Sequence, residues 1–287
     1  MEINKKNILV LWAKWMLWNA IFSFLKKENK LIVFWTSNWI QEWFINFSVD
    51  NKLNEKIENI FNEYNFDYVI NCIWYIRPKS NSSIDEYNKS LFINSYFPKI
   101  LDFYSNKFNF KLIHFSTDCV FDWKKWNYSI DDFPNEFSIY WLSKFLWEIS
   151  NSNSLTIRTS IIWIELTKVN KNLLNWFLSN QDWTKISWFS NVYWNWVTTI
   201  TLAKIILKII NEKININGLV QIASEKISKY ELLLLFNNIF TRNIIIENKS
   251  NIKSNKTIVP SVEQKYFINE IKTLDKQIIE LKEFYKL

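Results

Sequence analysis

The sequence predicts an α/β protein built on a doubly wound parallel sheet, followed by a smaller C-terminal lobe. Short apolar runs without polar alternation indicate strands that are buried on both faces of such a sheet. Amphipathic helical segments alternate with these runs up to about Thr159, which implies right-handed crossovers between parallel strands. After Thr159 the pattern becomes less regular. We therefore expect a Rossmann-like domain over residues 1–158 and mainly a second lobe over residues 159–287, with segments that return to the first core.

The individual elements follow from the same two patterns. Continuous apolar runs predict strands, and apolar positions three or four residues apart predict helices. In the first domain the expected strands are Asn7–Leu11, Leu31–Phe34, Asp67–Ile73, Lys111–Phe115 and Leu155–Ile157. The expected helices between them are Leu17–Lys27, Leu53–Tyr64, Ile84–Phe108 and Ile139–Ser150. The second lobe is expected to hold the helices Lys171–Asn180, Thr199–Asn211 and Lys229–Phe240, one helix near the C-terminus, and short strands at Leu219–Ile222 and Ile244–Ile246.

Composition argues against several classes of protein. No apolar run reaches the ~18 residues of a membrane span, and the N-terminal segment lacks the features of a secretory signal. The two cysteines form neither a CxxC pair nor a disulfide framework, and the single histidine, His114, is expected to be structural. The net charge of +7 comes from scattered lysines rather than from a basic stripe. We expect a cytoplasmic protein without a nucleic-acid, membrane or metal partner.

The unusual feature of the composition is its glycine and tryptophan content. The chain has 1 glycine and 17 tryptophans, whereas an ordinary domain of this length has about 20 glycines. Turns that need a positive φ cannot lose glycine cheaply. Two explanations are open: a truly tryptophan-rich protein, or a gene whose UGA codons encode glycine and are written here as tryptophan. The positions of the tryptophans distinguish between them.

Three tryptophans stand between the first expected strand and the first expected helix. Trp12, Trp15 and Trp18 have the spacing WxxWxxW. A dinucleotide-binding loop needs glycine at such positions, for a tight turn, for backbone approach to the pyrophosphate and for close helix–strand packing. The helix N-terminus presents free N–H groups to the phosphates, so Met16 and Leu17 join this expected loop. An aromatic stripe at helical spacing is the alternative, but these residues straddle the loop and not a settled helix.

A tyrosine and a lysine are expected to form a proton-transfer pair. Tyr140 and Lys144 are four residues apart on an expected helix, which places both side chains on one face. The ammonium can lower the pKa of the phenol, which can then donate a proton to a carbonyl that is reduced by hydride. A second match, from Tyr75 to Lys79, contains Pro78 and directly follows a strand, so it does not fit a helix.

A hydroxyl group is expected to act beside this pair. Ser116 and Thr117 lie at the carboxyl end of an expected strand, where open α/β sheets place their sites. A hydroxyl there can hydrogen-bond the carbonyl oxygen of a substrate. A capping or turn role is the alternative for both residues, and the downstream Tyr140 and Lys144 favour the catalytic one.

With glycine written at these tryptophans, the motifs resemble those of a known family. The matching stretches then read LVLGAKGMLGNA, VINCIGYIRP, FSTDCVFDGKKGNYSIDD, IYGLSKFLGE, IRTSIIG and NGVTT. In this form the chain resembles the dTDP-4-dehydrorhamnose reductases, which are sugar-nucleotide reductases among the extended short-chain dehydrogenase/reductases. The resemblance spans about residues 7–240 and weakens toward the C-terminus.

The resemblance implies which residues act. Thr117 corresponds to the family's catalytic threonine, Tyr140 to its proton-donating tyrosine and Lys144 to its lysine. The segment from Asn71 to Trp74 corresponds to the loop that lines the cofactor. The cofactor-binding residues expected in all are Trp12, Trp15, Met16, Leu17, Trp18, Thr36, Ser37, Asn71, Cys72, Ile73, Tyr140 and Lys144.

The resemblance also sorts the tryptophans. Trp141 and Trp147 correspond to the glycines of the family's YGxSKxxGE pattern, and Trp196 also falls where glycine is expected. Trp176 falls where an aromatic residue is expected, so it is kept as a genuine tryptophan. Trp194 is left open as a second genuine one.

The cofactor is expected to be NADPH or NADH. The residues after the second strand include no acid for a ribose 2′-hydroxyl and no arginine for a 2′-phosphate. Thr36, Ser37 and Asn38 can hydrogen-bond a phosphate, which slightly favours NADPH.

The function expected from these features is the NAD(P)H-dependent reduction of a 4-keto-deoxysugar nucleotide, in deoxysugar biosynthesis for cell-surface polysaccharide. Tyr140 would supply the proton, Lys144 would position the ribose, and Thr117 would orient the carbonyl. An NAD-dependent sugar-nucleotide epimerase or dehydratase and a non-catalytic nucleotide-binding regulatory subunit are the alternatives. A homodimer is the candidate assembly. The chain as written is expected to be inactive, because indoles would block the phosphate loop.

Overall fold

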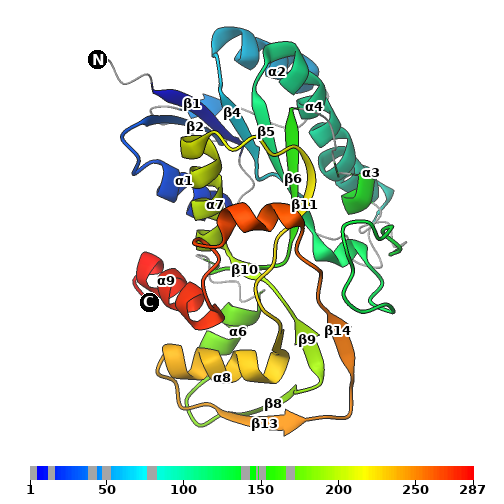
Figure 1. Ribbon diagram of the computed structural model, residues 1–287, viewed down its shortest axis with the longest axis vertical. Helices are drawn as coiled ribbons and strands as arrows, with labels where there is room; N and C mark the ends of the chain where they lie inside the picture. Colours follow the sequence, from blue (N-terminus) through cyan, green and yellow to red (C-terminus); the bar gives the residue numbers. More distant parts are fainter. Residues whose placement is uncertain are drawn as a thin grey trace.

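A seven-stranded sheet forms the centre of the protein, seen in a computed structural model (Figure 1). The structure describes residues 5–11, 17–37, 44–46, 53–75, 83–136, 143–146, 148, 153–165 and 172–287. The strand order is β11-β6-β5-β4-β1-β2-β3, and every neighbouring pair is parallel. These strands are β1 (Lys6–Leu11), β2 (Leu31–Ser37), β3 (Phe44–Asn46), β4 (Tyr68–Asn71), β5 (Lys111–Thr117), β6 (Ser154–Thr159) and β11 (Gly218–Gln221).

The order of the strands reverses between β1 and β4. The chain proceeds outward through β2 and β3, then returns to β4 and proceeds the other way through β5 and β6. In open α/β sheets this reversal opens a crevice at the carboxyl ends of the strands. The doubly wound, Rossmann-like fold predicted from the sequence is therefore confirmed.

Helices cover both faces of the sheet (Figure 1). Ile8 and Val10 of β1 contribute to the core under α1 and α7, whereas Leu9 and Leu11 contribute to the core under α2 and α4. Successive side chains of a strand point to opposite faces, which explains why the run 8–11 is apolar without alternation. These helices are α1 (Leu17–Leu25), α2 (Leu53–Glu63), α4 (Phe97–Phe108) and α7 (Thr199–Glu212).

The remaining elements form a smaller lobe, drawn in the lower part of Figure 1, and a few connections. Its helices α6, α8 and α9 share a third apolar core. Short strands pair as β7 with β10, β8 with β13, and β9 with both β12 and β14. The bounds are α6 (Leu173–Ser179), α8 (Lys229–Ile239), α9 (Leu274–Tyr285), β7 (Ile161–Ile162), β8 (Lys185–Phe189), β9 (Val192–Trp194), β10 (Val197–Thr198), β12 (Ile227–Ser228), β13 (Ile245–Lys249), β14 (Ser254–Lys256), and the 3₁₀ segments η2 (Asp118–Val120) and η3 (Val262–Phe267).

The expected elements agree with the structure except in three places. The helix expected over Ile84–Phe108 is divided into α3 (Ile84–Leu91), a π-helical segment η1 (Phe92–Tyr96), and α4. Strands β3, β7, β8, β9, β10, β12 and β14 were not predicted, because most of them have only two or three residues and show no periodicity. The helix expected over Ile139–Ser150 falls mostly outside the described residues. Within that range the structure describes 143–146, which are helical, and residue 148.

None of the helices in the described parts of the chain combines the length and the apolar character needed to cross a bilayer.

A buried ion pair ties the sheet to the segment that follows residue 143. The Arg158 guanidinium on β6 donates to both carboxylate oxygens of Glu148, at 2.8 and 2.6 Å, and the two side chains are 1% and 9% exposed. Ser116 at the end of β5 donates to the same carboxylate at 2.7 Å. Arg158 also donates to Gln221 on β11 at 2.8 Å. Because the pair is desolvated, it is stable only while these additional bonds are made.

We expect the substitution Arg158→Met to lower the free energy of unfolding by about 3–5 kcal/mol, because it leaves the Glu148 carboxylate buried without its cation. Urea unfolding followed by circular dichroism measures this. The exposed ion pair between Lys107 and Glu58 provides the control, and Lys107→Met should change the midpoint little. Equal losses in the two variants would contradict the assigned importance of the buried pair.

Candidate active site

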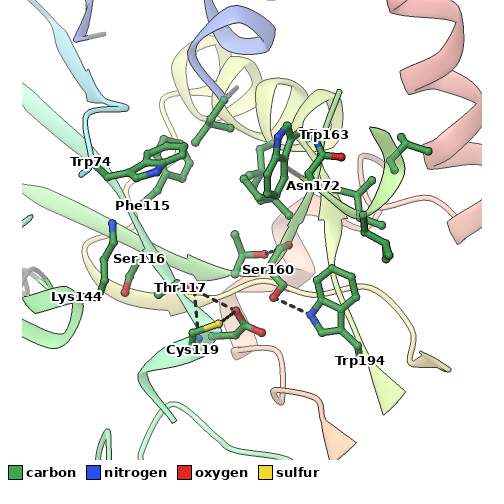
Figure 2. Close-up of a pocket in the computed structure, with 18 of the residues that line it drawn as sticks. Trp74, Phe115, Ser116, Thr117, Cys119, Lys144, Ser160, Trp163, Asn172 and Trp194 are labelled. Atoms are coloured by element: carbon green, nitrogen blue, oxygen red, sulfur yellow. Dashed lines mark hydrogen bonds between the residues drawn. The ribbon is translucent and has the colours of Figure 1, made fainter. Parts of the chain in front are cut away.

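A cavity of about 680 Å³ lies at the carboxyl end of the sheet, between the sheet and the smaller lobe. Figure 2 shows Trp74 and Lys144 on one side of it and Trp163 and Trp194 on the opposite side. The cavity is lined by Leu17, Trp74, Phe115, Ser116, Thr117, Asp118, Cys119, Lys144, Thr159, Ser160, Ile161, Ile162, Trp163, Glu165, Asn172, Leu173, Leu174, Trp194 and Leu202. It lies where the strand-order reversal predicts a site.

Thr117 ends β5 and enters the cavity wall. Its side-chain oxygen caps η2 by accepting from the N–H of Cys119 at 3.2 Å, and its hydroxyl donates to Asp118 at 3.1 Å. The capping role weighed for this residue is therefore present. The Thr117 side chain still lines the cavity, so its hydroxyl can donate a hydrogen bond to a ligand instead of to Asp118.

Lys144 lies in the helical segment 143–146 and is 5% exposed. Its ammonium stands 5.6 Å from the ring centroid of Trp74, a cation–π contact. Burial lowers the pKa of Lys144 well below its usual value. Tyr140, its expected partner, lies outside the described residues.

The loop after β4 is held by Asn71. The Asn71 side chain accepts from the N–H of Ile73 at 3.0 Å and contacts Nδ1 of His114 on β5 at 3.2 Å. Cys72 and Ile73 are buried beside it, and burial raises the pKa of the Cys72 thiol. His114, expected to be structural, is completely buried, and burial lowers its pKa.

The other expected cofactor residues are placed in part. Leu17 begins α1 and lines the cavity, and Thr36 is buried near the end of β2. Trp18 is the second residue of α1, and Ser37 ends β2. The residues Trp12, Trp15 and Met16 lie outside the described part of the chain. The structure therefore brings Leu17, Thr117 and Lys144 to one cavity, with the β4 loop entering it through Trp74.

Asn94 is a residue that sequence reasoning missed. It lies in η1, where its side chain accepts from the backbone N–H of Tyr75 at 2.7 Å and donates to the carbonyl of Tyr75 at 3.1 Å. It also donates to Ser143, next to Lys144, at 3.3 Å. Asn94 thus connects the β4 loop to the segment that carries Lys144. π-helical segments are frequent at functional sites, but their one-residue insertion leaves no mark in the sequence.

The far wall of the cavity was also missed. Trp194 donates its indole N–H to the hydroxyl of Ser160 at 2.8 Å, as drawn in Figure 2. Ser160 directly follows β6, so the rule that placed Thr117 could have found it. Asn172 and Trp194 come from the smaller lobe and carried no comparable signal.

No group of three or more histidine, cysteine, aspartate or glutamate side chains is arranged to hold a metal ion among the residues that the structure describes.

Comparison with known proteins gives one family match and many structural matches. The family model for the RmlD substrate binding domain matches residues 6–258. A dTDP-4-dehydrorhamnose reductase from Clostridium acetobutylicum is 19% identical, with a TM-score of 0.76 over 98% of this chain and 100% of that chain. The Bacillus anthracis dTDP-4-dehydrorhamnose reductase in complex with NADP is 15% identical, with a TM-score of 0.75 over 99% and 100% of the two chains.

An ADP-L-glycero-D-manno-heptose-6-epimerase from Helicobacter pylori is 14% identical, with a TM-score of 0.75 over 100% of this chain and 97% of that chain. No curated protein matches the chain in sequence. At these identities the structural likeness establishes the fold, and one fold hosts several chemistries.

We expect Lys144→Met to raise the free energy of unfolding at pH 7, because it removes a buried ammonium whose pKa is lowered by burial. At a pH where Lys144 is protonated in the unfolded chain, folding must either bury its charge or remove its proton, and both lower the free energy of unfolding. The gain should therefore shrink as the pH rises toward the unfolded lysine pKa of about 10.4. Urea unfolding at pH 7 and pH 10 measures it, with the exposed Lys30→Met as control. A Met variant less stable than the parent at pH 7 would refute this account.

Proposed function

The chain belongs to the RmlD substrate binding domain family, and from this premise we propose that it is an NAD(P)H-dependent reductase of a 4-keto-deoxysugar nucleotide, such as dTDP-4-dehydro-L-rhamnose. The observation that carries the proposal is that Thr117 and Lys144 line one cavity at the carboxyl ends of the strands. In this assignment residues 1–158 bind the dinucleotide and residues 159–287 mainly bind the substrate, while β11 joins the edge of the sheet and α7 packs on one of its faces. The enzyme would act in the cytoplasm, in deoxysugar biosynthesis for cell-surface polysaccharide, with a homodimer as the candidate assembly.

The proposed roles follow from the chemistry of each group. The Thr117 hydroxyl hydrogen-bonds the C4 carbonyl oxygen, and the Tyr140 phenol donates the proton that this oxygen needs when C4 is reduced. The Lys144 ammonium favours the ionised form of Tyr140 and binds a ribose hydroxyl. The bound nicotinamide supplies the hydride.

The described residues fit the nicotinamide end of such a cofactor. The N-terminus of α1, the loop after β4 and Lys144 meet at the cavity, which is large enough for a small-molecule ligand. Thr36, buried near the end of β2, carries a hydroxyl but no charge, so it does not exclude a 2′-phosphate. The related Bacillus anthracis reductase is in complex with NADP. We propose NADPH or NADH, with NADPH favoured.

We further propose that most tryptophans of the written chain are glycines encoded by UGA. Trp123 and Trp183 have φ values of 63° and 70°, in the left-handed region that favours glycine and that bulky side chains rarely adopt. The indole N–H groups of Trp163 and Trp196 are buried and have no hydrogen-bond partner within the described part of the chain. A buried indole N–H usually finds a partner.

Trp176, kept as a genuine tryptophan, and Trp194, left open above, behave differently. The Trp194 indole is bonded to Ser160, and Trp176 of α6 packs against the apolar core of the smaller lobe. Trp74 and Trp163, assigned as glycines, place indoles in the cavity wall. Glycine at position 74 would open the cavity beside Lys144, and glycine at position 163 would widen it at the opposite wall. We therefore propose that the chain as written is inactive.

We expect the glycine-restored protein, with tryptophan kept at 176 and 194, to oxidise NADPH in the presence of a dTDP-4-keto-6-deoxysugar. Tyr140→Phe should lower kcat by about 10²–10⁴-fold, because the proton donor is lost. Absorbance at the nicotinamide band gives the rate, and Tyr87→Phe, on α3, is the control. Absence of oxidation with every keto-sugar nucleotide would refute the reductase. Tightly held NAD with no net oxidation would indicate an epimerase or dehydratase.

For the recoding, we expect Trp183→Gly in the written chain to raise the free energy of unfolding by about 1 kcal/mol, because it relieves a left-handed residue whose side chain is exposed. Trp176→Gly should lower it by about 2–4 kcal/mol, since it removes packing from helix α6. Chemical denaturation compares the two. Peptide sequencing of the native protein decides directly: tryptophan at positions 12, 15 and 18 would rule the recoding out.

A further inference from the structure

Two lysines stack on opposite faces of strand β9. Tyr193 and Trp194 are successive residues of β9, so their side chains point to opposite sides. The ammonium of Lys226 lies 4.8 Å from the ring centroid of Tyr193, and that of Lys229 lies 3.7 Å from the ring centroid of Trp194. Because Trp194 lines the cavity, Lys229 is the lysine on the cavity face of the strand.

Lys256 stands on the same face. It pairs with Trp194 in the parallel register of β14 and β9, and paired residues of adjacent strands point to one side of a sheet. Its ammonium is close enough to the Cys119 thiol to lower the pKa of that group, although burial and Asp118 raise it more. The Lys229 ammonium therefore contacts Trp194, and the Lys256 ammonium lies 5.9 Å from the ring centroid of Trp123 on the same side of the sheet. Both lysines lie next to cavity-lining residues at the end away from Lys144 (Figure 2 shows Trp194 and Lys144 at opposite sides).

The charges at this end do not balance. Burial lowers the pKa of Lys229 to about 8, while the Asp118 carboxylate opposes that shift and Lys256 adds to it. Asp118 is the carboxylate that acts on Lys229, and it already accepts hydrogen bonds from Thr117 and Cys119. Among the residues that the structure describes, no salt bridge involves Lys229 or Lys256. Lys229 and Lys256 together carry one more positive charge than Asp118 can balance, beside the partly buried ring of Trp194.

We propose that Lys229 and Lys256 bind the diphosphate of the nucleotide-linked substrate, with Trp194 as the apolar wall beside it. The inference rests on the proposed function and deepens it, because it assigns the two ends of one cavity. Thr117 and Lys144 take the reacting end of the sugar, and the lysines on the β9 face take the anionic end. A lysine ammonium suits a diphosphate, which offers several oxygens without fixed bidentate geometry.

The consequence is a specificity for diphosphate-linked sugars over free sugars. A substrate without the diphosphate leaves the partly buried Lys229 ammonium without an anion, which penalises the complex. A substrate with it replaces water around both lysines by charge-assisted hydrogen bonds. The lysines act on binding and not on the reacting atoms, so they should affect KM more than kcat.

The test is calorimetric titration of the glycine-restored protein, with tryptophan kept at 176 and 194, using dTDP and thymidine as probes. Lys229→Met should weaken dTDP binding on the order of ten- to a hundredfold, the loss expected for a charged hydrogen bond. Thymidine binding should be unchanged. Lys226→Met is the matched control, because it removes the same kind of cation–π lysine from the opposite face of β9, and it should bind dTDP as the parent does. Lys229→Arg should keep most of the affinity.

Unchanged dTDP binding in Lys229→Met would overturn the assignment, and so would an equal loss of dTDP and thymidine binding, which would indicate general disruption of the lobe. In a steady-state assay KM for the sugar nucleotide should rise in Lys229→Met while kcat stays within about twofold of the parent. A parent that binds dTDP through Lys229 but oxidises no nicotinamide would refute the proposed reductase and leave the diphosphate subsite standing. A parent that oxidises the nicotinamide cofactor but binds dTDP equally well in Lys229→Met would refute the diphosphate subsite and leave the proposed reductase standing.

Discussion

The buried pair of Arg158 and Glu148 is the interaction on which the candidate site depends. Removing a guanidinium and a carboxylate from water costs several kcal/mol for each ion, so the pair persists only where additional hydrogen bonds support it. Here Ser116 and Gln221 supply them, and the supporting residues come from β5 and β11. Arg158, Glu148, Ser116 and Gln221 must meet for these bonds to form. Their meeting holds the end of β5 next to the segment that carries Lys144. The position of Thr117, at the end of β5, relative to Lys144 is therefore set by the core and not by the loops above it.

The parts that could be predicted from the sequence are those governed by local rules. A strand buried on both faces typically contains a continuous apolar run, and β1 shows this over 8–11, with Ile8 and Leu9 in different cores. A polar residue at the carboxyl end of such a strand then stands at the crevice, which is why Thr117 could be located. The site was also predictable in part because its residues are close in the chain to the strands that position them.

The remaining parts depend on contacts between distant segments. Strand β9 has three residues and pairs with β12 and β14, neither of which shows a pattern of its own. The wall formed by Trp194, and with it Lys229, therefore has no local signal. Asn94 is similar, because its role comes from a π-helical turn and from bonds to Tyr75 and Ser143. Hydrogen-bonding partners that lie many residues apart are chosen by the fold, and only coordinates identify them.

Residues with a positive φ show where the low glycine and high tryptophan content affects the backbone. Gly218, the single written glycine, has a φ of 76°. Asn109 and Asn127 occupy the same region, and asparagine is the side chain that tolerates it best. Trp123 and Trp183 adopt it too, although a bulky side chain rarely does, and the Trp183 side chain is exposed. A chain free to choose would use glycine or asparagine at both turns. These two turns therefore favour glycine over the tryptophan that is written, in line with the proposed recoding, and glycine in place of Trp74 would also widen the cavity beside Lys144.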